Sequence, residues 1–172
     1  MKICVVTDIH DRPGPGACIA SGLHPLPGVM RLSLSGLCGR PDLSGEALHR
    51  HLFQEGGMGE VVHALRRKVE GCRIGIGYSA GGTAIWRAAA AGLPFEAIFC
   101  VSSTRLREEG AISTPNHVFF GAGDHGKPSA EWLSAVPGEA TIFDAVGHAY
   151  YLDPASEAAR ATRAVIAERI GR

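Results

Sequence analysis

Short apolar runs alternate along this chain with longer stretches in which apolar residues recur every three to four positions. The short runs have the length and the flanking turn residues of buried β-strands. The longer stretches predict helices over residues 58–69 and 80–91, and a last helix that ends near Gly171. Asp153 is the expected cap of that last helix, with Pro154 in its first turn. The predicted strands cover residues 3–7, 29–35, 72–77, 97–101, 117–121 and 140–143.

This alternation predicts an α/β fold in which helices cover both faces of a mostly parallel sheet. We therefore expect a three-layer sandwich with about six strands. With 172 residues, 45% hydrophobic and 20% charged, the chain has the size and composition of one globular domain, residues 1–172. The Gly- and Pro-rich stretch 13–27 reads as an irregular loop after the first strand, beside the edge where open α/β sheets bind ligands.

Charge and apolar patterning limit the partners. Lys plus Arg and Asp plus Glu both number 17, so the chain lacks the positive field that supports nucleic-acid binding. No apolar run has membrane-spanning length, and the first one stops at Asp8 without the features of a signal peptide. We expect a cytoplasmic protein that acts on a small, weakly charged molecule and binds neither nucleic acid nor membrane. A homodimer is compatible with the sequence.

The cysteines argue against a metal centre or a disulfide scaffold. There are five of them, scattered and without a Cys-x-x-Cys pair. Such an odd, dispersed set is typical of buried reduced thiols. We assign no metal and no cofactor to the chain.

The segment Gly77-Tyr78-Ser79-Ala80-Gly81 lies between a predicted strand and a predicted helix of small residues. A sharp strand-to-helix turn exposes the central serine, and the glycines on either side leave room where backbone segments come close. The motif can occur by chance in a chain with 23 glycines, but the strand before it and the helix after it favour a nucleophile elbow. The Ala80 N–H, at the helix start, is the first expected oxyanion donor.

A serine nucleophile needs a histidine base, and that histidine needs a carboxylate to orient it. After Ser79 the histidines are His117, His125 and His148. His117 opens a predicted strand and therefore lies at the wrong edge of the sheet, while His125 directly follows the candidate acid Asp124. His148 follows the last predicted strand on a loop that could hang over the serine, so we predict it as the base.

The candidate acids at the ends of predicted strands are Asp124 and Asp144. Asp124 ends the run Gly121-Ala122-Gly123-Asp124, whose glycines permit a tight bend toward the site, although a loop aspartate that caps a turn is the simpler alternative. The predicted triad is Ser79, Asp124 and His148.

With these motifs, the sequence resembles the α/β-hydrolase superfamily and, within it, the dienelactone hydrolase relatives. The resemblance extends over nearly the whole chain and is most specific at the elbow. It implies a minimal α/β-hydrolase fold with sheet order 2-1-3-4-5-6, without the first two strands usual in the superfamily and without a cap domain. It also implies that the N–H of Ile9, after the first strand, completes the oxyanion hole.

Two residues depart from the dienelactone hydrolases proper, which carry cysteine in place of Ser79 and glutamate in place of Asp8. Their lactone chemistry is therefore not transferred. A serine nucleophile implies a carboxylic ester hydrolase that acts on a small ester, thioester or lactone through an acyl-enzyme. Candidates for contacting the substrate are Asp8, His10, Tyr78 and Tyr150, although core packing explains the two tyrosines equally well. Arg105 and Arg107 are candidates for binding a substrate carboxylate, for which a solvated basic loop is the simpler explanation.

Two other functions compete with this one. Asp8-Ile9-His10 also resembles the Asp-x-His opening of metallophosphoesterases, in which both side chains bind a metal, but the further ligands of that family are incomplete and out of order here. The fold can also serve as a binding module without catalysis. Labelling by a fluorophosphonate probe distinguishes an activated serine from a binding module.

Overall fold

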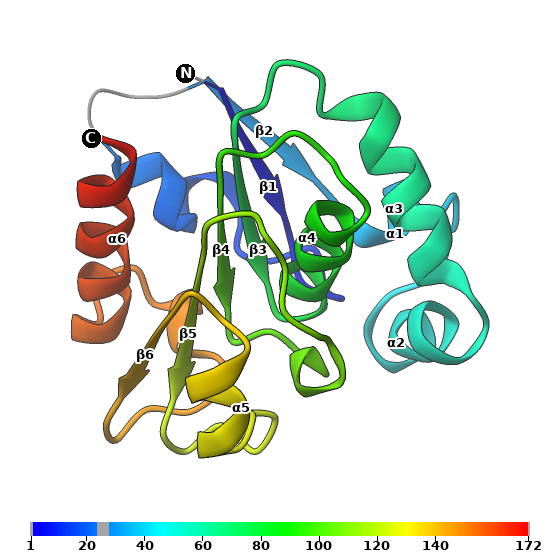
Figure 1. Cartoon of the computed structure of the whole chain (residues 1–172). Helices are drawn as coiled ribbons and strands as arrows, with labels where there is room; N and C mark the ends of the chain where they lie inside the picture. The colour runs from blue at the N-terminus through cyan, green and yellow to red at the C-terminus, as the bar shows by residue number, and fades with distance from the viewer. Residues whose placement is uncertain (1, 24–27, 172) are drawn as a thin grey trace.

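The computed structural model describes residues 2–23 and 28–171, which form a single six-stranded parallel sheet (Figure 1). The strand order is β2-β1-β3-β4-β5-β6, which confirms the predicted order. Every neighbouring pair is parallel, so all the strands end at the same edge of the sheet. The strands are β1 (Lys2–Val6), β2 (Gly28–Leu32), β3 (Ile74–Tyr78), β4 (Ala97–Val101), β5 (Asn116–Gly121) and β6 (Glu139–Phe143).

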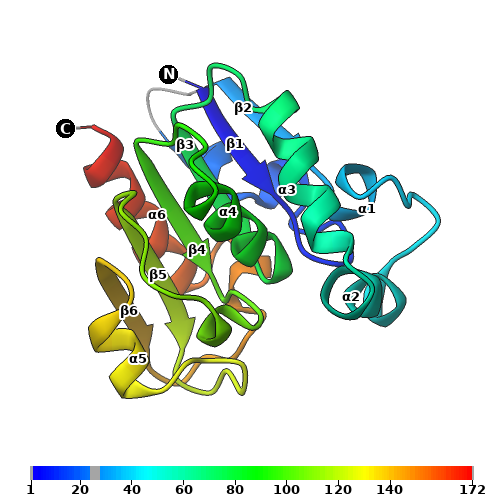
Figure 2. The same cartoon turned by 45° about the vertical axis from the view of Figure 1, so that its right-hand side comes forward.

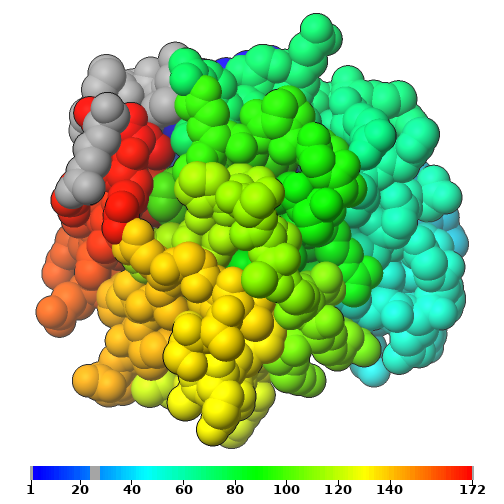
Figure 3. Space-filling view, viewed as in Figure 1, coloured from blue at the N-terminus to red at the C-terminus, as the bar shows by residue number. Residues whose placement is uncertain are grey.

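Helices cover both faces of the sheet, as expected for a three-layer sandwich (Figure 2). On one face lie α3 and α4, with α5 near one end, and on the other face lies α6. Figure 3 shows the side chains of α3, α4 and α5 closing the first face. The α-helices are α1 (Leu34–Leu37), α2 (Gly45–Gln54), α3 (Gly57–Lys68), α4 (Ala80–Ala90), α5 (Ala130–Ala135) and α6 (Glu157–Ile170); the 3₁₀ helices are η1 (Pro15–Ala17), η2 (Ile19–Gly22), η3 (Leu106–Glu108) and η4 (Tyr150–Leu152).

Alternate residues of each central strand pack into two separate hydrophobic cores, one on each face of the sheet. In β1, Cys4 and Val6 join the core under α3 and α4, whereas Ile3 and Val5 join the core under α6. This follows from the two-residue period of a strand, and both faces are apolar because both are covered. Because they are packed on both faces, the central strands form a rigid frame. The site residues follow directly after the ends of these strands.

Glycines in β3 let α4 lie close against the sheet. A Cβ on Gly75 would come within 2.9 Å of Ile85, and one on Gly77 would overlap the backbone of Gly81. Both glycines face α4, while Ile74, Ile76 and Tyr78 fill the opposite core. The chain can then turn sharply from β3 into α4.

Two predicted boundaries were wrong. Ser156 caps α6, with its hydroxyl accepting from the Ala159 N–H at 3.2 Å, whereas Asp153 accepts from the Ala155 N–H at 3.0 Å in a turn before the helix. The second strand ends at Leu32, because the next residue, Ser33, caps α1. Both errors arise because serine and aspartate cap turns and helices alike.

Helices α1, α2 and α5 were not predicted, and part of the predicted loop, residues 24–27, lies outside the described residues. Residues 102–115, between β4 and β5, contain only the short η3, so no helical cap is built there. Within the described ranges, no helix has the length and apolar character needed to cross a bilayer.

Candidate active site

Ser79 occupies the sharp turn between β3 and α4. Its backbone has φ 52° and ψ −124°, a conformation that residues other than glycine rarely adopt. The Ser79 N–H donates to the carbonyl of Val101 at 2.9 Å, which ties the turn to the end of β4. The strained backbone is held by its surroundings, as is common where a side chain must be aimed at a site.

The structure brings Ser79, His148 and Asp124 into one hydrogen-bonded chain. Ser79 Oγ lies 3.1 Å from His148 Nε2, and His148 Nδ1 lies 2.9 Å from Asp124 Oδ2. With Nδ1–H donating to the carboxylate, Nε2 carries the lone pair that can accept the serine proton. The three residues come from the ends of different strands and meet at the carboxyl edge of the sheet.

The carboxylate is buried and the imidazole is open to solvent. The Asp124 side chain is 3% exposed and that of His148 is 39% exposed. The second carboxylate oxygen of Asp124 accepts the Gly126 N–H at 2.8 Å, so the carboxylate orients its own turn as well as the histidine. Asp124 therefore also caps its own turn, which was the alternative role expected from the sequence.

Backbone contacts hold the His148 loop against the Asp124 turn. The Gly123 N–H donates to the Val146 carbonyl at 3.0 Å, and the Ala122 N–H donates to Phe143 O at 2.8 Å. A Cβ on Gly121 would overlap the Val146 carbonyl, so glycine is required at this approach. This explains how Asp124 and His148, which are 24 positions apart in the chain, come within hydrogen-bond distance.

The N–H groups expected to bind an oxyanion are those of Ala80 and Ile9. Ala80 is the first residue of α4, where N–H groups point outward from the helix end. Gly81 lies so close to the carbonyls of Val6 and Thr7 that a Cβ there would overlap them, which brings the end of β1 against the elbow. Ile9 follows in the next turn, and its N–H finds no backbone acceptor in the part of the chain that the structure describes.

Asp8 holds the turn that carries Ile9. Its Oδ1 accepts the N–H groups of His10 at 2.8 Å and Arg12 at 2.9 Å, and its Oδ2 accepts Arg12 Nε at 3.1 Å and the Tyr151 hydroxyl at 3.1 Å. The side chain is 2% exposed. Burial raises the pKa of Tyr151, so its hydroxyl stays protonated and donates. The Asp8 carboxylate is thus engaged within the fold by Arg12, Tyr151 and the backbone of its own turn.

The same contacts disfavour a metal at Asp8 and His10. The Arg12 guanidinium lies 3.0 Å from the Asp8 carboxylate, where a cation would have to compete with it. His10 is exposed, and its ring lies beside Gly45 at the start of α2. Within the described ranges, no three histidine, cysteine or acidic side chains gather in a way that could hold a metal ion.

The two tyrosines expected near the substrate are buried in the core under α6. Tyr78 is fully buried, and its hydroxyl accepts the Ile19 N–H at 2.9 Å. Tyr150 is 7% exposed, and its hydroxyl lies 3.1 Å from that of Thr162. Tyr78 points away from the elbow because side chains alternate along β3. In this conformation packing, rather than substrate contact, explains both residues.

Sequence reasoning missed two side chains that adjoin the triad. Thr104 Oγ1 lies 2.8 Å from Ser79 Oγ, and the Tyr151 ring stands edge-on to that of His148 with centroids 6.2 Å apart. The signal for Thr104 was its place just after β4, at the same sheet edge as the triad. Tyr151 stood in a run of two tyrosines, of which only Tyr150 was considered.

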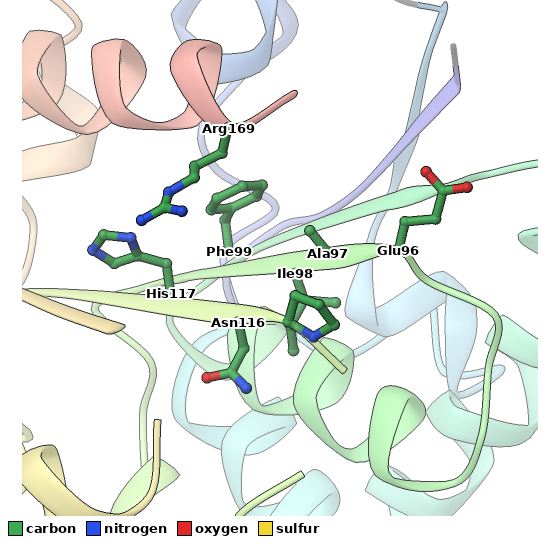
Figure 4. A pocket seen from close by; sticks show the side chains of 8 residues that line it. Glu96, Ala97, Ile98, Phe99, Asn116, His117 and Arg169 are labelled. Atoms are coloured by element: carbon green, nitrogen blue, oxygen red, sulfur yellow. The ribbon is translucent and has the colours of Figure 1, made fainter. Parts of the chain in front are cut away.

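A cavity of about 230 Å³ lies at the opposite edge of the sheet, where β4 and β5 begin (Figure 4). His117 lines it, as expected for a residue at the amino edge, and its Nε2 lies 2.8 Å from Thr141 Oγ1. Arg169, which also lines the cavity, is ion-paired with Glu139. These side chains are thus engaged within the fold and lie far from Ser79 along the strands.

Known structures share this fold, whereas sequence comparisons find no relative. No protein-family model and no curated protein matches the sequence. A predicted CIB-like hydrolase from Thermoplasma acidophilum matches 97% of this chain and 86% of its own, with a TM-score of 0.71 and 16% identity.

Two further solved structures have a similar fold. A candidate dienelactone hydrolase from Klebsiella pneumoniae matches 99% of this chain and 86% of its own, with a TM-score of 0.68 and 16% identity. Est1E from Butyrivibrio proteoclasticus, solved with ferulic acid bound, matches 100% of this chain and 90% of its own, with a TM-score of 0.65 and 14% identity. Together with the six-stranded parallel sheet, these likenesses establish that the chain has the α/β-hydrolase fold.

Proposed function

We propose that this protein is a serine hydrolase that cleaves small carboxylic esters, thioesters or lactones through an acyl-enzyme. The observation that carries the proposal is the hydrogen-bonded chain from Ser79 Oγ to His148 and on to the buried carboxylate of Asp124. Hydrolases and esterases with the same fold support the reaction class.

In the acylation step, Ser79 Oγ bonds to the carbonyl carbon while its proton passes to His148 Nε2. The carbonyl oxygen becomes negative and is stabilised by the N–H groups of Ala80 and Ile9. When the tetrahedral intermediate collapses, the bond to the leaving group breaks and the proton moves from His148 to that group. A water molecule, deprotonated by the same imidazole, then attacks the acyl carbon. The bond from that carbon to Ser79 Oγ breaks, the acid leaves, and His148 returns the proton to Ser79 Oγ.

The site favours a neutral acyl group over a carboxylate. Arg105, the basic side chain nearest in sequence to Thr104, donates to Glu108 at 3.0 Å. Its guanidinium also lies over the Phe53 ring, 5.3 Å from the centroid. Arg105 is thus already paired with an acidic side chain, and the exposed Arg107 donates to the Gly126 carbonyl at 3.4 Å.

Replacing the serine tests the proposal. Ser79→Ala should abolish hydrolysis of p-nitrophenyl acetate and labelling by a fluorophosphonate, because it removes only the nucleophilic oxygen. Ser134→Ala, which alters an exposed serine in α5, is the matched control and should keep both. The measurements are initial rates, labelling in a gel and thermal melting of each variant.

The outcomes separate the competing functions. Near-normal turnover by folded Ser79→Ala would refute the triad. A wild-type protein that neither labels nor hydrolyses would favour a binding module. Activity that is lost in EDTA and restored by manganese would favour metal chemistry at Asp8 and His10.

A further inference from the structure

The Thr104 hydroxyl is a second partner of the nucleophile. Ser79 Oγ lies 2.8 Å from Thr104 Oγ1 and 3.1 Å from His148 Nε2. A serine hydroxyl has one proton, and the reaction requires it to point at the histidine. Ser79 Oγ then accepts a hydrogen bond, and the Thr104 O–H is the donor.

The loop after β4 holds Thr104 in this place. Ser102 and Arg105, on either side of it, have φ values of 46° and 62°, in the left-handed region. The Thr83 hydroxyl donates to the Thr104 carbonyl at 2.5 Å, and the Ser102 N–H donates to Phe119 O at 2.8 Å. The backbone of this loop is therefore held by two neighbouring elements, α4 and β5.

The sheet order assigns a direction to each group on the reacting carbon. Strand β3, which ends at the elbow, lies between β1 and β4. The oxyanion faces Ala80 and Ile9 on the β1 side, and the leaving group must face His148 to receive its proton. The direction that remains for the acyl chain is the β4 side, beside Thr104.

We propose that Thr104 is a specificity-determining residue that selects acyl groups with a neutral oxygen on the carbon next to the carbonyl. Alkoxyacetyl, 2-hydroxyacyl and 2-ketoacyl esters belong to this class. The inference rests on the proposed function and adds the substrate class to it.

The physical reason is the fate of the Thr104 donor during the reaction. Once Ser79 Oγ bonds to the acyl carbon, it becomes an ester oxygen and a poorer acceptor. An oxygen on the adjacent carbon is separated from Ser79 Oγ by only two carbon atoms, so a donor 2.8 Å from Oγ can reach it. A plain alkyl chain leaves the donor without this partner, which costs free energy.

Two esters of equal size test the inference. Methoxyacetate and butyrate chains differ only in an ether oxygen that replaces a methylene, so kcat/KM for their p-nitrophenyl esters is compared. Each value is divided by the hydroxide-catalysed rate of the same ester, because the ether oxygen also activates the carbonyl. Wild type should prefer methoxyacetate. Thr104→Val, which keeps the shape without the hydroxyl, should lower that preference about tenfold, and Thr104→Ser should retain it.

Thr104→Ala, melting curves and fluorophosphonate labelling complete the experiment. An unchanged ratio in folded Thr104→Val and Thr104→Ala would overturn the inference, and so would loss of both activities in these two variants, which would make Thr104 a positioning residue for Ser79. Fluorophosphonate labelling of the wild type distinguishes this failure from failure of the proposed function. An activated Ser79 reacts with the probe regardless of which acyl group Thr104 selects.

Discussion

Ser79 and its neighbours each have a different hydrogen-bonding role at the site. Ser79 Oγ has one partner that can take its proton, His148, and one that can donate, Thr104. Asp124 pairs with the far side of the imidazole and with the backbone of its own turn. Asp8 forms no hydrogen bond with these four residues, yet through the Tyr151 hydroxyl it ties the Ile9 turn to the segment after His148.

The triad residues should act as one unit. We expect His148→Ala and Asp124→Asn each to lower kcat by about 10³- to 10⁵-fold, and the double variant to be little worse than the poorer single one. Measuring kcat for the four proteins checks this. Losses that multiply in the double variant would contradict the assignment.

At the scale of elements, the elbow depends on glycines that allow β1, β3 and α4 to touch. Gly77 and Gly81 lie against backbone atoms that cannot move aside without shifting an element. The Ser79 conformation is costly by itself, and these contacts hold it. The position of the nucleophile is therefore set by the packing of three elements rather than by the loop alone.

A pair of glycine substitutions tests this dependence. Gly81→Ala should destabilise the protein by about 2–3 kcal/mol and reduce activity, because the new methyl meets the carbonyls of Val6 and Thr7. Gly59→Ala, in α3, is the control: nothing lies within 4 Å of the added Cβ, so it should stabilise the helix by about 0.5–1 kcal/mol and leave activity unchanged. Urea unfolding and initial rates measure both effects. Equal stability of the two variants would show that the elbow tolerates the displacement.

The whole molecule presents its site on an uncapped edge. Only residues 102–115 connect β4 to β5, and the His148 side chain is 39% exposed. The walls that remain are short loops, which can enclose few carbons of an acyl chain.

A shallow site should select short acyl chains. Burial of each methylene contributes about 0.8 kcal/mol, so an open site gains little as the chain lengthens. We expect kcat/KM on p-nitrophenyl esters to be highest at acetate or butyrate and to fall by decanoate. The series from acetate to dodecanoate measures this. A maximum at the long end would mean that a second molecule, such as another copy of this chain, builds the missing wall.

The sequence by itself determined the order of the strands and the residues that could form the triad. Apolar runs predict the strands because both faces of a parallel sheet are buried, and the turns of Ser79, Asp124 and His148 follow strands, so all three had to meet at one edge. These are properties of local pattern and chain order.

Only the tertiary structure decided which neighbours each side chain has. Tyr78 is one residue from Ser79 but faces the opposite core, because alternate side chains point to opposite faces. Asp8 is turned to Arg12 and Tyr151, and Thr104 is brought to the nucleophile from 25 residues away. Such contacts depend on how the elements pack, and Tyr151 and Thr104 lie too far along the chain from Asp8 and Ser79 for the local pattern to predict these contacts.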